Sequence, residues 1–190
     1  MSSAEERARR RAELDAKVPE VDLRNGHKGI CTWAQTNGDE LHPAALEILG
    51  EARRLSTKLD DQTVTTIVIG KNAEKHAQTL IEHGADRVYV ISDDRLEFYR
   101  DLPYTRAIVD AIREIKPEIM IYTASAIGRS LAPRCAARLH VGLSADCTEL
   151  DIGQYVNRKK QQRFPRAFMM KRPSFGESKL ATIIGPWHYP

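Results

Sequence analysis

Apolar and polar residues alternate in regular blocks from about residue 29 to residue 139. Blocks with apolar residues every three or four positions predict helices at residues 43–59, 72–83, 104–115 and 129–139, the last with Pro133 in its first turns. Short blocks rich in β-branched residues predict buried strands at residues 29–35, 63–70, 87–92 and 118–124. Strands that alternate with helices at this spacing predict a doubly wound α/β fold with a mostly parallel sheet.

The two ends of the chain break this rhythm. Residues 1–26 are polar and rich in helix formers, so we expect a helical extension that is solvated or clasps a partner, before a domain at residues 27–190. Residues 142–152 predict a fifth, more polar strand. A polar and basic hairpin connection is expected at 154–166, and extended segments at 166–174 and 180–185. The fold class is therefore Rossmann-like α/β with an N-terminal polar helix and a C-terminal extended β segment.

The first candidate binding element is the turn at residues 123–129, between the fourth strand and the last helix. Ligands of such sheets bind at the carboxyl ends of the strands. Small residues around Ser125, Gly128 and Arg129 would let backbone N–H groups approach an anion or a polar ring. The turn lacks the spacing of both the phosphate-binding and the dinucleotide-binding glycine motifs. A tight turn that binds no ligand is the alternative.

Two further candidates lie towards the C-terminus. Strand alternation would place Ser144, Asp146 and Thr148 on one face, where they would line a cofactor site or a subunit interface. The alternative is an edge strand whose polar face is exposed to solvent. Arg172 precedes Pro173, which restricts the backbone, so its guanidinium could be held against an electron-rich ring. A surface turn is the alternative for Arg172.

Composition excludes several classes of protein. The net charge of +3 comes without a basic face interleaved with aromatic residues, so no nucleic-acid binding is expected. No apolar run reaches the roughly 18 residues of a membrane span. Cys31, Cys135 and Cys147 form no C-x-x-C pair and are expected to be buried thiols of a cytoplasmic protein, with no metal site. His76 and His83 are expected on a helix surface, and no catalytic set is expected.

Several motifs together carry a family resemblance over about residues 27–186. They are the opening KGICTWAQTNGDE, then HGAD, KPEI, the segment 125–138, GLSADCT and RPSFG. In this combination they resemble the α subunit of electron-transfer flavoproteins. The form Ala145-Asp146-Cys147-Thr148 resembles the electron-bifurcating members. Glu177-Ser178 stands where the family usually has a Gly-Asn pair.

This resemblance implies an N-terminal domain whose fold is like that of the adenine nucleotide α-hydrolases. It also implies a β subunit of related fold, which binds AMP or a second FAD. The complex would transfer electrons to or from an acyl-CoA dehydrogenase, with ferredoxin as a further partner. Arg172 would approach the β-subunit flavin, and 125–129 and 144–148 would lie along the same interface. FAD is expected mainly on the β subunit or on a C-terminal domain. The alternatives are a scaffold subunit and a stand-alone adenine-nucleotide-binding domain.

Overall fold

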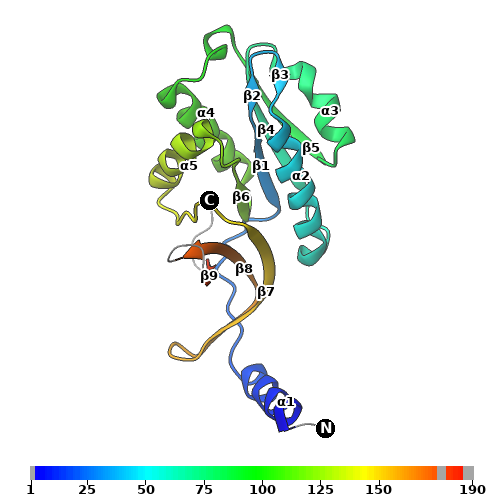
Figure 1. Cartoon of the computed structure of the whole chain (residues 1–190), viewed down its shortest axis with the longest axis vertical. Helices are drawn as coiled ribbons and strands as arrows, with labels where there is room; N and C mark the ends of the chain where they lie inside the picture. Colours follow the sequence, from blue (N-terminus) through cyan, green and yellow to red (C-terminus); the bar gives the residue numbers. More distant parts are fainter. Residues whose placement is uncertain (1–2, 175–178, 186–190) are drawn as a thin grey trace.

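The computed structural model describes residues 3–174 and 179–185 and has a four-stranded parallel sheet at its centre (Figure 1). Its strands lie in the order β5-β4-β1-β6, and every neighbouring pair is parallel. All residues of β1 and β4 are buried, as the run of apolar and β-branched residues predicts. The four predicted strands are confirmed, and they are β1 (Ile30–Ala34), β4 (Val64–Gly70), β5 (Arg87–Ser92) and β6 (Ile119–Ile121).

Helices cover both faces of this sheet, which confirms the doubly wound α/β fold (Figure 1). One apolar cluster joins the sheet to the α2 side, and a second joins it to the α4 and α5 side. A small hairpin of β2 (Thr36–Asn37) and β3 (Glu40–Leu41) follows the carboxyl end of β1. The helical segments are α2 (Pro43–Ser56), η1 (Thr57–Leu59), η2 (Ala73–His76), α3 (Ala77–Glu82), η3 (Asp94–Leu96), α4 (Asp101–Ile115) and α5 (Ala126–Leu139).

The beginnings of three helical segments differ from the predictions. Helix α5 starts at Ala126, so Pro133 lies inside the helix rather than in its first turns. Helix α4 starts at Asp101, three residues before the predicted start. Asn72 has a left-handed backbone and makes no side-chain cap, and a 3₁₀ segment precedes α3. That segment turns His76 inward, where it is 8% exposed, so its predicted place on the surface is wrong.

The fifth strand predicted at residues 142–152 begins only at Glu149, and it lies outside the parallel sheet. Residues 141–148 form a loop, in which Asp146 has a left-handed backbone (φ 57°) that a continuous strand does not accommodate. The predicted hairpin connection at 154–166 is confirmed: its turn lies at 158–161, and its other residues belong to the two antiparallel strands that the turn joins. A second, antiparallel sheet of order β7-β8-β9 results, made of β7 (Glu149–Asn157), β8 (Gln162–Ser174) and β9 (Lys179–Ile184). The last two strands confirm the predicted extended segments.

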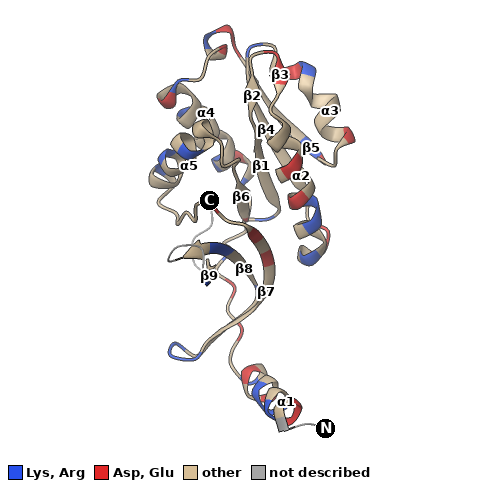
Figure 2. Cartoon of the chain, viewed as in Figure 1, with Lys and Arg blue, Asp and Glu red and all other residues tan. Residues whose placement is uncertain are grey.

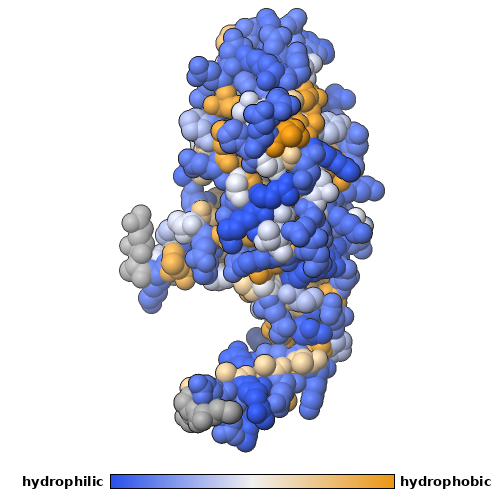
Figure 3. All heavy atoms as spheres, turned by 90° about the vertical axis from the view of Figure 1, so that its right-hand side faces the viewer, coloured by the Kyte–Doolittle hydropathy of each residue, from blue (hydrophilic) through white to orange (hydrophobic). Residues whose placement is uncertain are grey.

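The N-terminal helix α1 (Ser3–Ala16) stands away from both sheets, at the end of the molecule reached by the β7–β8 turn (Figure 1). Its surface is mostly hydrophilic (Figure 3). This confirms the predicted polar helix. Within the described residues, no helix has the length and apolar character that a membrane crossing requires.

Candidate functional site

The order of the parallel strands places a switch point between β1 and β6. The chain passes outward from β1 through β4 to β5 and then returns to the other side of β1 with β6. Crossovers leave the sheet in opposite directions at this point, which opens a crevice at the carboxyl ends of β1 and β6. Gln35 follows β1 and Thr123 follows β6, so both residues lie at this crevice.

A buried polar network occupies the crevice. Gln35 and Thr123 are only 4% and 2% exposed. The Gln35 Oε1 accepts hydrogen bonds from the Ser125 hydroxyl and, at 3.4 Å, from the Thr123 hydroxyl. The Gln35 Nε2 donates to Asn37 Oδ1 at 3.1 Å. The polar side chains at the switch point are therefore satisfied within the chain. Sequence reasoning placed Gln35 at a strand end, where ligands of such sheets bind, but did not name it among the site residues.

The predicted small-residue turn is tight because of Gly128. A Cβ at this position would lie 1.9 Å from the carbonyl oxygen of Thr123, which no side chain tolerates. Ser125 caps α5, and its Oγ accepts a hydrogen bond from the Gly128 N–H at 3.0 Å. The Arg129 N–H donates to the Ser125 carbonyl at 2.9 Å, so the turn uses two of its backbone N–H groups internally.

Arg129 links this turn to the loop at 141–148. Its Nε donates to the Ala124 carbonyl at 3.1 Å, and its guanidinium pairs with the Asp146 carboxylate at 2.7 Å. Both side chains remain about half exposed. Four predicted site residues therefore lie together at the N-terminus of α5: Ser125, Gly128, Arg129 and Asp146.

The remaining predicted residues belong to the loop and the antiparallel sheet. The Cys147 thiol lies 3.4 Å from the Ser144 hydroxyl, and the Thr148 N–H donates to the Lys171 carbonyl at 2.8 Å. Arg172 follows Lys171 on β8 and pairs with Ala181 of β9. Ser144, Asp146 and Thr148 share no strand face, because the left-handed Asp146 ends the alternation. Among the described residues, no hydrogen bond or ion pair joins Arg172 to the α5 turn.

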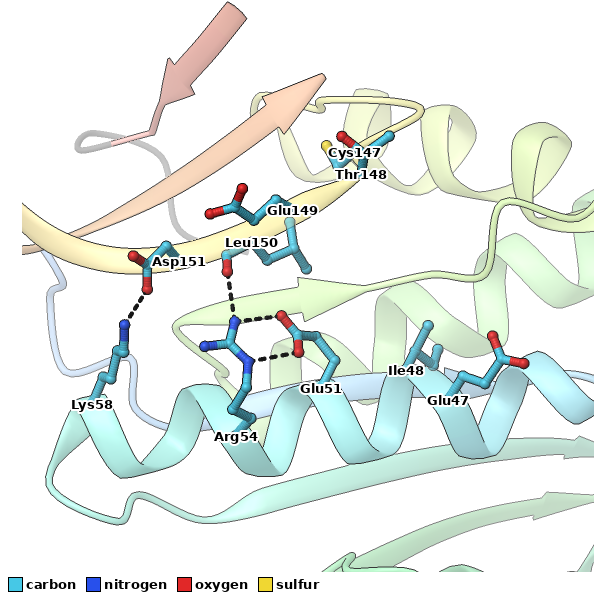
Figure 4. A pocket seen from close by; sticks show the side chains of 10 residues that line it. All are labelled: Glu47, Ile48, Glu51, Arg54, Lys58, Cys147, Thr148, Glu149, Leu150 and Asp151. Carbon is cyan, nitrogen blue, oxygen red and sulfur yellow. Dashed lines mark hydrogen bonds and ion pairs between the residues drawn. The ribbon is translucent and has the colours of Figure 1, made fainter. Parts of the chain in front are cut away.

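An open groove of about 530 Å³ lies between α2 and the first residues of β7 (Figure 4). Cys147 and Thr148 lie at one end of it. Lys58 pairs with Asp151 at the other end, and its hydrogen bond holds the pKa of Asp151 below the usual range. Arg54 pairs with Glu51 and donates to the Leu150 carbonyl at 2.6 Å. The sequence does not signal this groove, because tertiary packing alone brings β7 to α2.

The thiols and the buried carboxylate show no arrangement for acid–base chemistry. Cys31 and Cys135 are buried, as expected, whereas Cys147 is only half-buried. Burial raises the pKa of Cys31 and of Cys135, so these thiols stay protonated. The pKa of Glu118 is raised by burial, although Arg24 lies 3.8 Å away. In the described part of the chain, no group of three or more His, Cys, Asp or Glu residues is placed to hold a metal ion.

Comparison with known proteins identifies the family. Residues 31–190 match the electron transfer flavoprotein domain. The electron transfer flavoprotein subunit alpha of Thermoanaerobacterium thermosaccharolyticum is 41% identical over 85% of this chain and 46% of its own length. The acryloyl-CoA reductase electron transfer subunit beta of Anaerotignum propionicum is 36% identical, over 87% of this chain and 48% of its own.

A third relative is the lactate dehydrogenase (NAD(+),ferredoxin) subunit LctC of Acetobacterium woodii. It is 31% identical over 83% of this chain and 35% of its own length. The chain thus spans about half, or less, of the length of these relatives. The family match covers most of the sequence, including the α5 turn, the 141–148 loop and β8. The chain belongs to the electron transfer flavoprotein domain family.

Proposed function

We propose that this chain is the N-terminal domain of an electron transfer flavoprotein α subunit, which pairs with a β subunit and shapes a flavin site. Residues 1–26 are its helical extension and residues 27–190 are the domain. The observation that carries the proposal is the place of Arg172. This half-buried cation has no hydrogen-bonding or ion-pairing partner among the described residues, and it lies next to Lys171, which binds the end of the 141–148 loop.

The donors on this surface fit an electron-rich ring. The Ser144 and Thr148 hydroxyls lie on the loop, and the Arg172 guanidinium offers five N–H donors and a permanent charge. A bound flavin would supply one- and two-electron transfer. The role of Arg172 would be to stabilise negative charge on the reduced ring, while the hydroxyls would orient the ring. A second subunit must complete the site, because these groups lie on an open surface.

The β9 strand supports pairing with another subunit. Leu180 is 62% exposed and Ile183 is 38% exposed, and Leu143 of the nearby loop is 49% exposed. In the described residues, β9 pairs only with β8, so its other edge is open. Exposed apolar residues beside an open strand edge are typical of a protein interface.

We further propose the chemistry of the whole complex from its relatives. The name of the acryloyl-CoA reductase subunit favours an acyl-CoA dehydrogenase-type partner. The name of the lactate dehydrogenase (NAD(+),ferredoxin) subunit favours electron bifurcation with ferredoxin. FAD would be held mainly by the β subunit or a C-terminal domain, and in members that do not bifurcate electrons AMP would take the place of FAD on the β subunit. A stand-alone nucleotide-binding role has less support, because Gln35, Thr123 and Ser125 satisfy one another in the crevice.

Arg172→Ala in the complex with the β subunit tests the proposal. Loss of the cation should lower the midpoint potential of the β-subunit flavin, because the anionic reduced form loses a favourable charge. One partly solvated charge about 4 Å away contributes about 1 kcal/mol, equivalent to about 40 mV for one electron. Spectroelectrochemical titration measures the potential.

Arg172→Lys is the matched control, because it keeps the charge and should retain most of the potential. An Ala variant that binds flavin normally at an unchanged potential would remove Arg172 from the mechanism. A wild-type chain that neither binds a β subunit nor yields a flavin-containing complex would overturn the proposed function itself.

A further inference from the structure

Helix α1 is exposed along nearly its whole length and buries no apolar face. Its only large apolar side chain, Leu14, is 63% exposed. The ion pairs Arg9–Glu13 and Arg10–Glu6 are spaced i,i+4 and are exposed. Pairs of this kind stabilise a helix by only about 0.3–0.5 kcal/mol each. An isolated helix of 14 residues is marginal in water, so contacts outside α1 must hold it in place.

Those contacts come from the β7–β8 hairpin. The N–H of Arg163 donates to the Pro19 carbonyl, and the N–H of Val21 donates to the Arg163 carbonyl, both at 3.0 Å. The chain after α1 therefore forms a single parallel bridge to β8, at Glu20 and Arg163. Arg163 also pairs with Glu20 at 3.2 Å, and Arg158 of the turn pairs with Asp15 of α1 at 2.7 Å. Helix α1 and the hairpin turn thus form one unit, called here the arm: residues 3–21 and 155–163.

The arm contains the positive excess of the chain. It has nine basic and five acidic residues, whereas the whole chain has a net charge of only +3. Figure 2 shows the basic turn of the hairpin and the mixed charges of α1 at the same end of the molecule. Arg158 and Arg163 are used in anchoring, and the exposed Lys159 and Lys160 form the tip of the turn.

One face of α1 combines charge with an apolar side chain. Arg7, Arg11 and Leu14 are spaced four and three residues apart, so they lie along the same side of the helix. An exposed leucine flanked by arginines can enter an apolar pocket while the arginines bind carboxylates at its rim.

We propose that the arm is a docking surface for a partner protein that presents an apolar pocket rimmed by Asp and Glu residues. This interaction lies beyond the flavin-shaping role, because the arm carries none of the candidate flavin residues. Charge complementarity selects an acidic partner and would speed its association. The leucine supplies the contact that persists when salt screens the charges.

A protein fits the arm better than a nucleic acid or a membrane. Glu5, Glu6 and Glu13 interrupt the positive charge along α1, so the helix presents no continuous basic stripe for a phosphate backbone. Tyr155 is the aromatic residue of the arm, and its ring stacks on that of the adjacent Phe164 with centroids 6.2 Å apart. The stacked pair offers no platform for bases. A single leucine is too little apolar surface for a helix that lies in a bilayer interface.

The test uses the full chain and three variants. Lys159→Glu/Lys160→Glu reverses the charge of the tip, and Leu14→Ala removes the apolar contact from a solvent-exposed position. Arg106→Glu/Arg113→Glu on α4 is the control, because it changes the net charge equally at exposed sites away from the arm. Labelled poly-L-glutamate, a short DNA duplex and phosphatidylglycerol vesicles are titrated against each protein at low salt and at about 0.15 M salt.

The wild-type chain should bind poly-L-glutamate at low salt, and the tip variant should bind about tenfold more weakly, while the control stays within about twofold. Proteins retained from cell extract by the wild type should then include an acidic species that both the tip and the Leu14→Ala variants lose. Equal binding by the tip variant and the control would overturn the proposal. So would tighter arm-dependent binding of DNA or vesicles, or an extract in which Leu14→Ala loses no protein. Wild-type association with a β subunit is measured separately, so failure of the arm leaves the proposed function intact.

Discussion

At the residue scale, Gly128 decides whether α5 can begin where it does. The Thr123 carbonyl oxygen fills the space that a side chain at residue 128 would need, and the Ser125 cap depends on this close approach. Ser125 also donates to Gln35, so the same turn fixes the buried network at the switch point. A change at this one glycine therefore affects the helix start, its cap and the end of β1 together.

Gly128→Ala is expected to lower the free energy of unfolding by about 1–3 kcal/mol, because the backbone must shift to relieve the overlap. Gly50→Ala in α2 is the control, since a Cβ there meets no atom within 4 Å. That change should raise stability by about 0.5–1 kcal/mol, because alanine favours a helix. Urea denaturation measures both, and equal effects of the two changes would contradict the described turn.

Glu118 makes stability depend on pH. Its pKa is raised by burial, so the folded state binds the proton more tightly than the unfolded state does. The stabilisation is complete below the ordinary pKa of a glutamate and is lost as pH rises through the raised folded pKa. Arg24 and Arg166 oppose this shift, and the nearby Asp22 adds to it.

Glu118→Gln should therefore gain stability relative to the wild type as pH rises from the acid range to neutrality. Urea denaturation across that range measures the difference, with the exposed Glu47→Gln as control. A difference between Glu118→Gln and wild type that is independent of pH would show that Glu118 titrates normally.

At the element scale, the loop at 141–148 joins the parallel sheet with its helices to the antiparallel sheet. The sequence predicts the first of these two structures better than the second. The parallel sheet and its helices follow from hydrophobic periodicity, because each strand and helix buries one continuous apolar pattern. The antiparallel sheet cannot be predicted from hydrophobic periodicity in the same way. A half-polar strand such as β7 has the same alternation of apolar and polar residues whether it joins the parallel sheet or forms a hairpin. The left-handed Asp146 decides between them, and an Ala-Asp-Cys sequence gives no warning of it.

The same limit applies to the candidate site. The turn with Ser125 and Gly128 was predictable, since a strand followed by small residues and a helix has few possible geometries. The Arg129–Asp146 contact was not, because it joins residues from two elements whose relative placement depends on tertiary packing.

Asp146→Asn tests the importance of that contact for the loop. Asparagine tolerates the left-handed backbone but cannot pair with Arg129 as an ion. Global stability should fall by less than about 1 kcal/mol, because the pair is half exposed. Amide hydrogen exchange in residues 141–148 should become faster. Asp110→Asn on α4, which removes the exposed ion pairs with Arg106 and Arg113, should leave exchange in the loop unchanged.

At the scale of the whole molecule, the described residues leave two surfaces open: the β9 edge and the arm. They belong to different parts of the chain and have different chemistry, one apolar and one positively charged. The groove between α2 and β7 is a further feature of the surface, in which Lys58 pairs with Asp151 across the groove and Arg54 pairs with Glu51 along α2 (Figure 4). We therefore expect subunit pairing at β9 and a separate partner at the arm.

Ile183→Asp should weaken association with the β subunit at least about tenfold, because it places a charge in the proposed apolar interface. Ile81→Asp on α3 is a matched control, since Ile81 is 41% exposed and Ile183 is 38% exposed. Sedimentation velocity of the mixed subunits measures the association. If both variants pair with the β subunit as the wild type does, β9 is not the interface.

The anchoring of α1 also has a consequence for synthesis of the protein. Helix α1 leaves the ribosome before the β7–β8 hairpin does, and the Arg158 that pairs with Asp15 follows 143 residues later. At typical elongation rates of 5–20 residues per second, this delay is about 7–30 s. During that interval the N-terminal segment has no hairpin to hold it, so chaperones, proteases and modifying enzymes meet it as an unanchored peptide. Once the β7–β8 hairpin has been synthesised and has folded, it anchors the N-terminal segment.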